Sequence, residues 1–189
     1  MDYQRLINKK HKVTKQELSN IKLVSTQNIN GKIVFLEAQT IKSYNLLKAE
    51  MQKHGIEIGI ISGYRSFKEQ QLETKELQKT HDKKYVKSVM APIGASEHHT
   101  GLAIDITVKK DGNFLPDNAS ALYSADDIYK KIHTHLHKFG FILRYPKGKE
   151  QITGYSYEPW HLRFVGLKLA KHLYKTGLTM EEYYKQKTG

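Results

Sequence analysis

Residues 101–108, GLAIDITV, constrain the fold more than any other stretch of this sequence. Large apolar residues alternate with small or polar ones, which is the pattern of a β-strand whose two faces meet different surroundings. One face is wholly apolar, whereas the other carries a single carboxylate, Asp105, among Gly101, Ala103 and Thr107. Because these neighbours are small, a group other than a large side chain can occupy the space in front of Asp105.

Helix and strand signals surround this segment. Apolar residues at helical spacing predict a helix over about 37–53, and the apolar run at 56–62 predicts a strand. Ser66 and Glu69 form a capping-box pattern that begins a helix running to about residue 80. The chain therefore alternates short strands with helices on both sides of residues 101–108.

The second half of the chain continues the same mixture. Ser124 is expected to cap a helix with an apolar stripe that Gly140 ends. Two strands and a last helix are expected at 141–145, at 161–165 and after the capping box of Thr179 and Glu182. Helices and short strands mixed in this way predict an α+β fold. The length of 189 residues suits a single compact domain over 1–189, with an N-terminal arm over about 1–30.

The amino-acid composition limits which residues can hold a metal and which kinds of partner the chain can bind. The chain has no cysteine, so a metal must be held by histidine and carboxylate. The formal net charge of +12 favours anionic partners such as nucleic acid, anionic lipid or acidic cell-wall polymer. The lysines are spread along the chain, so we interpret them as a solvated basic surface and do not expect nucleic acid as a partner.

No stretch of the sequence approaches the 18 to 20 apolar residues of a membrane span. The first residues also lack the apolar segment of a secretory signal. We therefore expect a cytoplasmic protein if Met1 is the natural start, and an exported or wall-associated one if a signal peptide has been removed. The oligomeric state has no signal in the sequence.

Two segments concentrate the residues that zinc hydrolases use, SEHHTGLAID at 96–105 and EPWH at 158–161. A catalytic zinc takes three protein ligands and leaves a fourth position open. Asp105 supplies a carboxylate and His161 an imidazole, and the second imidazole comes from His98 or His99, which spacing does not distinguish. Glu158 is suited to be the general base beside the metal.

Two other parts of the sequence have a simpler interpretation. His133 and His137, in HTHLH, stand one helical turn apart but have no carboxylate near them in sequence, so we expect solvated helix residues there. Trp160, beside His161, is expected to pack in the core beneath the site.

These motifs resemble the zinc D-alanyl-D-alanine carboxypeptidases of the VanY and VanXY type. SEHHTGLAID is similar to the family pattern SxHxxGxAxD, and YEPWHLRFVG at 157–166 to its ExWH segment. SGYRSFKEQ at 62–70 resembles the family's YRSxxxQ segment, and residues 139–155 resemble its linking region. The likeness covers most of the chain and is closest in layout to the VanXY type. It implies a small antiparallel sheet that carries the zinc site, with flanking helices.

The resemblance also assigns roles to residues. It implies that His98, Asp105 and His161 hold one zinc ion per chain, which selects His98 over His99, and that Glu158 is the catalytic base. Further pocket residues follow from the same motifs, with Arg65 also counted as catalytic: Arg65, Gln70, Ser96 and Tyr145. An arginine guanidinium in the pocket would hold a substrate carboxylate or a developing oxyanion.

The implied function is removal of C-terminal D-alanine from peptidoglycan stem peptides or precursors, and cleavage of the free D-Ala-D-Ala dipeptide. One alternative is an L,D-carboxypeptidase acting on tetrapeptide stems with the same metal site. Another is a non-catalytic protein on the same fold that binds cell wall or nucleic acid. Such a protein would be expected to have lost the base or a ligand, and His98, Asp105, Glu158 and His161 are all present.

Overall fold

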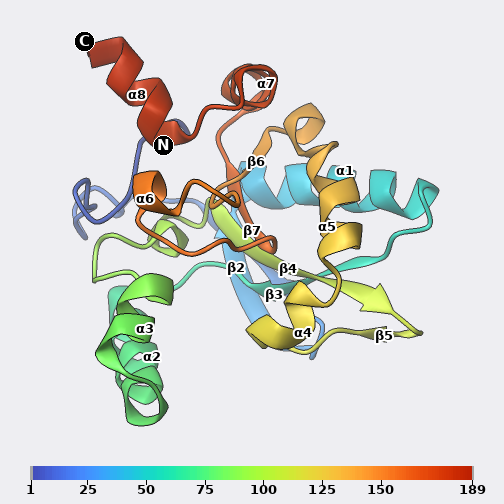
Figure 1. Ribbon diagram of the computed structural model, residues 1–189, viewed down its shortest axis with the longest axis horizontal. Coiled ribbons are helices and arrows are strands. Elements are labelled where there is room, and N and C mark those ends of the chain that lie inside the picture. Colours follow the sequence, from blue (N-terminus) through green and yellow to red (C-terminus); the bar gives the residue numbers. More distant parts are fainter. Residues whose placement is uncertain (1, 189) are drawn as a thin grey trace.

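The computed structural model describes residues 2–188 and is built on a five-stranded antiparallel sheet (Figure 1). The strand order is β3-β4-β7-β6, with β5 beside β4. The bounds of these strands are β3 Ile58–Ser62, β4 Ala103–Lys110, β5 Asn113–Phe114, β6 Phe141–Leu143 and β7 His161–Phe164. A separate hairpin joins β1 (Leu23–Gln27) to β2 (Ile33–Glu37). The expected α+β class and small antiparallel sheet are confirmed.

Eight α-helices and two short 3₁₀ helices are assigned within residues 2–188. The α-helices are α1 Ala38–Lys53, α2 Phe67–Thr80, α3 Lys83–Val89, α4 Ala119–Tyr123, α5 Asp126–His133, α6 Glu150–Thr153, α7 Leu167–Thr176 and α8 Met180–Thr188. The 3₁₀ helices are η1 Glu97–Thr100 and η2 Leu136–Phe139. In Figure 1, α2 and α3 project together from one end of the molecule, and α8 lies at another. None of the helices that the model describes is long and apolar enough to cross a membrane.

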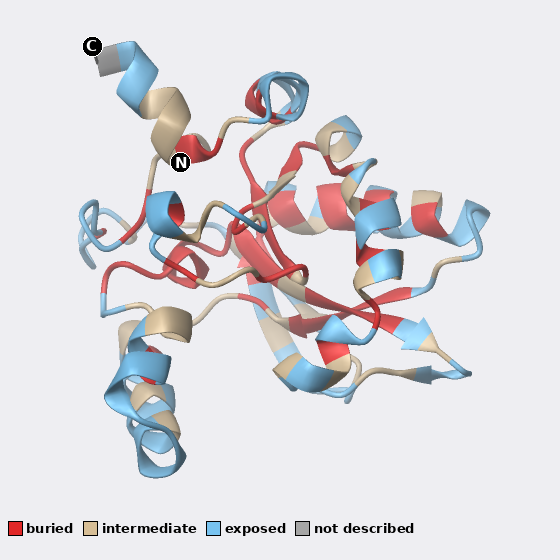
Figure 2. Cartoon of the chain, in the orientation of Figure 1, coloured by how far each residue is buried: buried red, intermediate tan, exposed pale blue. Residues whose placement is uncertain are grey.

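The apolar face of β4 lies at the centre of the core. Ile104 and Ile106 are fully buried and pack with residues of α1, α5 and β7. Tyr129 of α5 is also fully buried, and its hydroxyl donates a hydrogen bond to the Ile106 carbonyl, 3.0 Å away. Figure 2 shows the buried strands enclosed by helices whose outer faces are exposed. On the opposite face of β4, Asp105 lines a cavity.

Several local predictions are confirmed by the backbone. The capping box at the start of α2 is complete, since Ser66 and Glu69 exchange side-chain to backbone hydrogen bonds. Thr179 and Glu182 do the same before α8. The helix expected over 37–53 begins one residue later because Glu37 is its N-cap, with a carboxylate that accepts from the first-turn N–H groups.

The helix expected from Ser124 to Gly140 was wrong in its bounds. Ser124 ends α4, with its hydroxyl donating to the Ala121 carbonyl, and α5 ends at His133 before the separate turn η2. His133 and His137 therefore do not share one helix, and neither is simply solvated. His133 Nε2 lies 2.8 Å from the Pro159 carbonyl oxygen, and the His137 ring stacks on Tyr174 with centroids 3.8 Å apart.

Candidate active site

Three potential metal ligands come together from three elements. His98 lies in η1, Asp105 in β4, and His161 at the first position of β7, where strand register places it directly opposite Asp105. His98 Nε2 is 3.2 Å from Asp105 Oδ2, and His161 Nδ1 is 3.1 Å from Asp105 Oδ1. One donor atom from each of the three residues lies within 4.8 Å of the other two.

The outward nitrogen of each imidazole is already engaged. His98 Nδ1 is 2.7 Å from the Gly63 carbonyl, and His161 Nε2 is 3.4 Å from Glu97 Oε2. These contacts leave His98 Nε2 and His161 Nδ1 to point inward with free lone pairs. Asp105 Oδ1 is buried and accepts no hydrogen bond, although His161 Nδ1 is close. A buried carboxylate oxygen without a donor, beside two converging nitrogens, fits a cation such as zinc.

Charge supports the same interpretation. Burial alone would raise the pKa of Asp105, but the two imidazoles hold that pKa well below its usual range. Burial alone would lower the pKa of His161, yet Asp105 and Glu97 together raise it. The carboxylates of Asp105 and Glu97 therefore stabilise a positive charge at this position.

His99 is turned away from this cluster. Its Nδ1 lies 2.7 Å from the Arg65 carbonyl, and its ring packs on Phe67 with centroids 4.3 Å apart. The side chain is fully buried. The choice between adjacent histidines, which spacing left open, therefore has a geometric reason: the turn of η1 points His98 inward and His99 toward α2.

Glu158 lies beside the three potential metal ligands. Its Oε2 is 3.7 Å from His161 Nδ1, and its side chain is 12% exposed. The backbone N–H of Glu158 donates to the Tyr145 carbonyl, which fixes the loop before β7. Burial raises the pKa of Glu158 to about 8, against the lowering effect of His161. A carboxyl with a pKa near neutrality can both accept and return a proton at physiological pH.

A cavity of about 150 Å³ opens in front of these groups and is lined by the four expected pocket residues, Arg65, Gln70, Ser96 and Tyr145. Arg65 donates to Gln70 Oε1 at 3.1 Å and forms an ion pair with Glu73 at 3.0 Å. Gln70 also donates to the Ala91 carbonyl, so both ends of its amide are engaged within the protein. Gln70 thus holds Arg65 in place. Ser96 precedes η1 and makes no capping hydrogen bond.

Aromatic residues form part of the cavity walls, among them Tyr145 and Trp160. The Tyr145 ring lies 4.8 Å from the His161 ring, centroid to centroid, and is almost fully buried. Trp160 packs against the core, as expected, and also lines the cavity. Its ring contacts Tyr123 at a centroid distance of 5.0 Å.

Comparison with known proteins identifies the family. The family model described as VanY, D-alanyl-D-alanine carboxypeptidase, matches residues 34–167. This chain belongs to the VanY family. The match contains every residue of the metal cluster and cavity described above.

Relatives of the VanY family match at different lengths. The chain is 36% identical to VanXYC of Enterococcus gallinarum, a bifunctional D-Ala-D-Ala dipeptidase and carboxypeptidase, over 97% of this chain and 94% of that protein. It is 42% identical to YodJ of Bacillus subtilis over 71% of this chain, but spans only about half of that protein, 48%. The match to VanXYC therefore extends over nearly the whole of both chains.

Solved structures of related enzymes share the fold. A VanY D,D-pentapeptidase variant in complex with Zn(II) superposes with a TM-score of 0.77 at 27% identity, covering 97% of this chain and 99% of that one. The LD-carboxypeptidase LdcB gives 0.76 at 33% identity, covering 95% and 84%. The same fold therefore occurs in a D,D-pentapeptidase and in an LD-carboxypeptidase.

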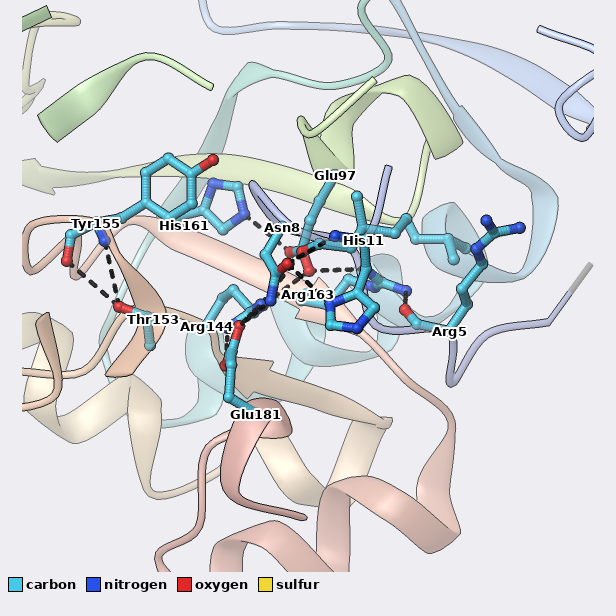
Figure 3. A network of polar contacts seen from close by, with 12 residues as sticks. Arg5, Asn8, His11, Glu97, Arg144, Thr153, Tyr155, His161, Arg163 and Glu181 are labelled. Carbon is cyan, nitrogen blue, oxygen red and sulfur yellow. Dashed lines mark hydrogen bonds and ion pairs between the residues drawn. The ribbon is translucent and has the colours of Figure 1, made fainter. Parts of the chain in front are cut away.

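One group that the sequence did not suggest is the buried carboxylate of Glu97 (Figure 3). Its Oε1 accepts hydrogen bonds from Arg144 at 2.7 Å and Arg163 at 2.8 Å, and all three side chains have no exposed surface. Burial alone would raise the pKa of Glu97, but the two arginines hold it well below its usual range. Glu97 is thus a charged acceptor for the outward nitrogen of His161.

This network reaches outside the part of the chain that the VanY model matches. Arg163 donates to the backbone carbonyls of Tyr3 and Arg5, and Arg144 to that of Ile7. Arg144 also forms an ion pair with Glu181 of α8, at 2.7 Å. Residues near both ends of the chain therefore contact the two arginines that bind Glu97. The partners lie up to 160 residues apart in sequence, which left no local pattern to predict them.

Proposed function

We propose that this chain is a zinc metallopeptidase that removes C-terminal D-alanine from peptidoglycan precursors or stem peptides, and that it also cleaves free D-Ala-D-Ala. The observation that carries the proposal is the convergence of His98, Asp105 and His161 beside the unligated carboxyl of Glu158. Membership of the VanY family and likeness to VanXYC over almost the full length support the same substrate class.

In this proposal His98 Nε2, Asp105 and His161 Nδ1 hold the zinc. A bound zinc ion acts as a Lewis acid and activates water as a nucleophile near neutral pH. Glu158 accepts a proton from the attacking water. As the peptide C–N bond breaks and the new C–O bond forms, Glu158 passes that proton to the leaving amine. Its distance of 3.7 Å from His161 Nδ1 places its carboxyl beside the ligands and leaves it free for this transfer.

Arg65 provides a reason for releasing a terminal residue. An arginine has five N–H donors, and the contacts of Arg65 with Gln70, Glu73 and Ser62 use three of them, which leaves two for a ligand. These can bind the free carboxylate of a C-terminal D-alanine. Because Gln70 and Glu73 fix the guanidinium, it is oriented before substrate arrives. A peptide without a terminal carboxylate at this position would lose that interaction.

L,D-carboxypeptidase activity on tetrapeptide stems is the second candidate, and the likeness to LdcB at 33% identity favours it. The metal cluster and Glu158 serve both reactions equally well. The two reactions differ in the configuration of the residue before the scissile bond, which the cavity wall must accommodate.

The test is hydrolysis of three substrates by the zinc-loaded full chain. Pentapeptide stem, tetrapeptide stem and free D-Ala-D-Ala are each incubated with the protein, and released D-alanine is measured. The proposal predicts release from the pentapeptide and the dipeptide, and loss of release after chelation. Release from the tetrapeptide alone would assign L,D specificity instead. No release from any of the three would leave a binding protein and overturn the proposed function.

A further inference from the structure

A second group of metal-ligating side chains lies away from the catalytic cavity. Glu50 and His54 stand one turn apart at the end of α1, and His135 lies in the turn between α5 and η2. One donor atom from each residue lies within 4.8 Å of the other two. None of the three lines the catalytic cavity. We propose that Glu50, His54 and His135 form a second binding site for a divalent transition-metal ion of the zinc class.

The geometry brings the three donors to one point. His54 Nε2 is 3.5 Å from Glu50 Oε1, and the two imidazole rings lie 4.6 Å apart, centroid to centroid, at an angle of 56°. The i,i+4 spacing on a helix sets the first pair on one face. The packing of α1 against η2 brings His135 to that face from a different part of the chain.

The remaining atoms of these residues are engaged in ways that leave the donors available. Glu50 Oε2 accepts from Lys53 at 3.1 Å, so Oε1 is the oxygen that faces His54. His135 Nδ1 is 3.3 Å from the Thr134 hydroxyl, which leaves Nε2 as its ligand atom. A hydrogen bond to the second ring nitrogen is the usual way in which proteins orient a metal-binding histidine.

The chemistry of the donors selects the class of ion. Two imidazoles and one carboxylate suit zinc, cobalt, nickel and copper, whereas calcium and magnesium take mainly oxygen ligands. Burial and the neighbouring Lys138 lower the pKa of His135, so its lone pair is available at neutral pH. The side chains of His54 and Glu50 are 48% and 24% exposed, so an ion can enter and leave without unfolding.

A cation at this site would join the end of α1 to the turn after α5. These two segments are 81 residues apart in sequence, from His54 to His135, and the neighbouring residues Met51 and Leu136 belong to the core. An ion that binds only the folded chain stabilises it by mass action. The site would therefore add to thermal stability without contributing to the reaction.

The test counts ions on the full chain. After chelation and removal of the chelator, Zn²⁺ is titrated by calorimetry and Co²⁺ by visible absorption. Wild type is expected to bind two ions per chain, the weaker of them lost in His54→Ala and in His135→Ala. His98→Ala should lose only the other ion. Peptidase activity is not the readout, so failure here is distinguishable from failure of the proposed function.

The matched control is His172→Ala, which removes an exposed histidine of α7 and should keep both ions. The second ion should also raise the melting temperature of wild type, and should not raise that of His135→Ala. One ion per chain in wild type would overturn the proposal. A second ion that binds His54→Ala and His135→Ala as tightly as wild type, within about tenfold, would also overturn it.

Discussion

Replacing Glu97 by glutamine tests whether a buried charge network supports the metal cluster. The change keeps the shape of the side chain and removes its charge. In the wild type, Glu97 and Glu181 balance Arg144 and Arg163, two negative charges against two positive. In Glu97→Gln one positive charge remains uncompensated among side chains that are nearly all without exposed surface.

The expected cost follows from that imbalance. Removing one partner of a buried ion pair lowers the free energy of unfolding by about 3–5 kcal/mol. A domain with a stability in the middle of the usual range of roughly 5–15 kcal/mol would stay mostly folded after that loss. Because the glutamine is a weaker acceptor for His161 Nε2, zinc affinity should also fall, by about 10- to 100-fold, as for other second-layer partners of a metal-binding histidine.

The assay is urea denaturation of the chelated protein, followed by circular dichroism, together with competition titration of zinc. The control is Glu57→Gln, which removes an exposed ion pair with Lys109 and should change either quantity little. A loss of less than about 1 kcal/mol in Glu97→Gln, with zinc affinity unchanged, would refute the reasoning.

Three further predictions concern the same region. His98→Ala should lose the catalytic zinc and His99→Ala should keep it, as measured by bound metal per chain; the reverse would show that the wrong histidine faces Asp105. The free energy of unfolding of Gly101→Ala, measured in urea, should be lower than that of wild type by more than about 2 kcal/mol, because the φ of 67° suits glycine and an added Cβ would lie 2.7 Å from the Glu37 nitrogen. An unchanged free energy of unfolding would contradict this. In the chelated protein, Glu158→Gln should gain stability relative to wild type as pH rises from about 5 to 8 in urea melts. The pKa of Glu158 is raised to about 8 in the folded state, so its contribution is present below the unfolded value of 4.5 and is lost toward pH 8; a constant difference across that range would contradict this.

The parts of the fold that the sequence predicted are those determined by neighbours along the chain. The capping box of Ser66 and Glu69 and the alternation around Asp105 are local patterns, and the structure has both. The hairpin β1–β2 and helix α7 were not predicted from the sequence. The break between α5 and η2 was missed because the apolar stripe continues through it, while the backbone turns at Thr134 and His135.

The candidate site divides in the same way. Asp105 and His161 could be selected as metal ligands from their residue types and surroundings, whereas the choice of His98 needed the family resemblance. The structure gives that choice a cause, since Gly63 and Arg65 hold the two histidines in different directions. Contacts between distant residues had no such signal. From the sequence alone, Glu97 would be expected to be an exposed surface residue. The arginines that bind it, Arg144 and Arg163, lie 47 and 66 residues away in sequence.

The catalytic role of Glu158 is tested most directly by Glu158→Gln, measured for zinc content and for turnover in one preparation. The substitution leaves His98, Asp105 and His161 untouched, so one zinc per chain should remain bound at the catalytic cluster. Turnover of the substrate that wild type cleaves should fall by about 10² to 10⁴, as expected for loss of a general base. Zinc retained with full turnover would remove Glu158 from the reaction, and loss of that zinc would show that Glu158 is itself a ligand.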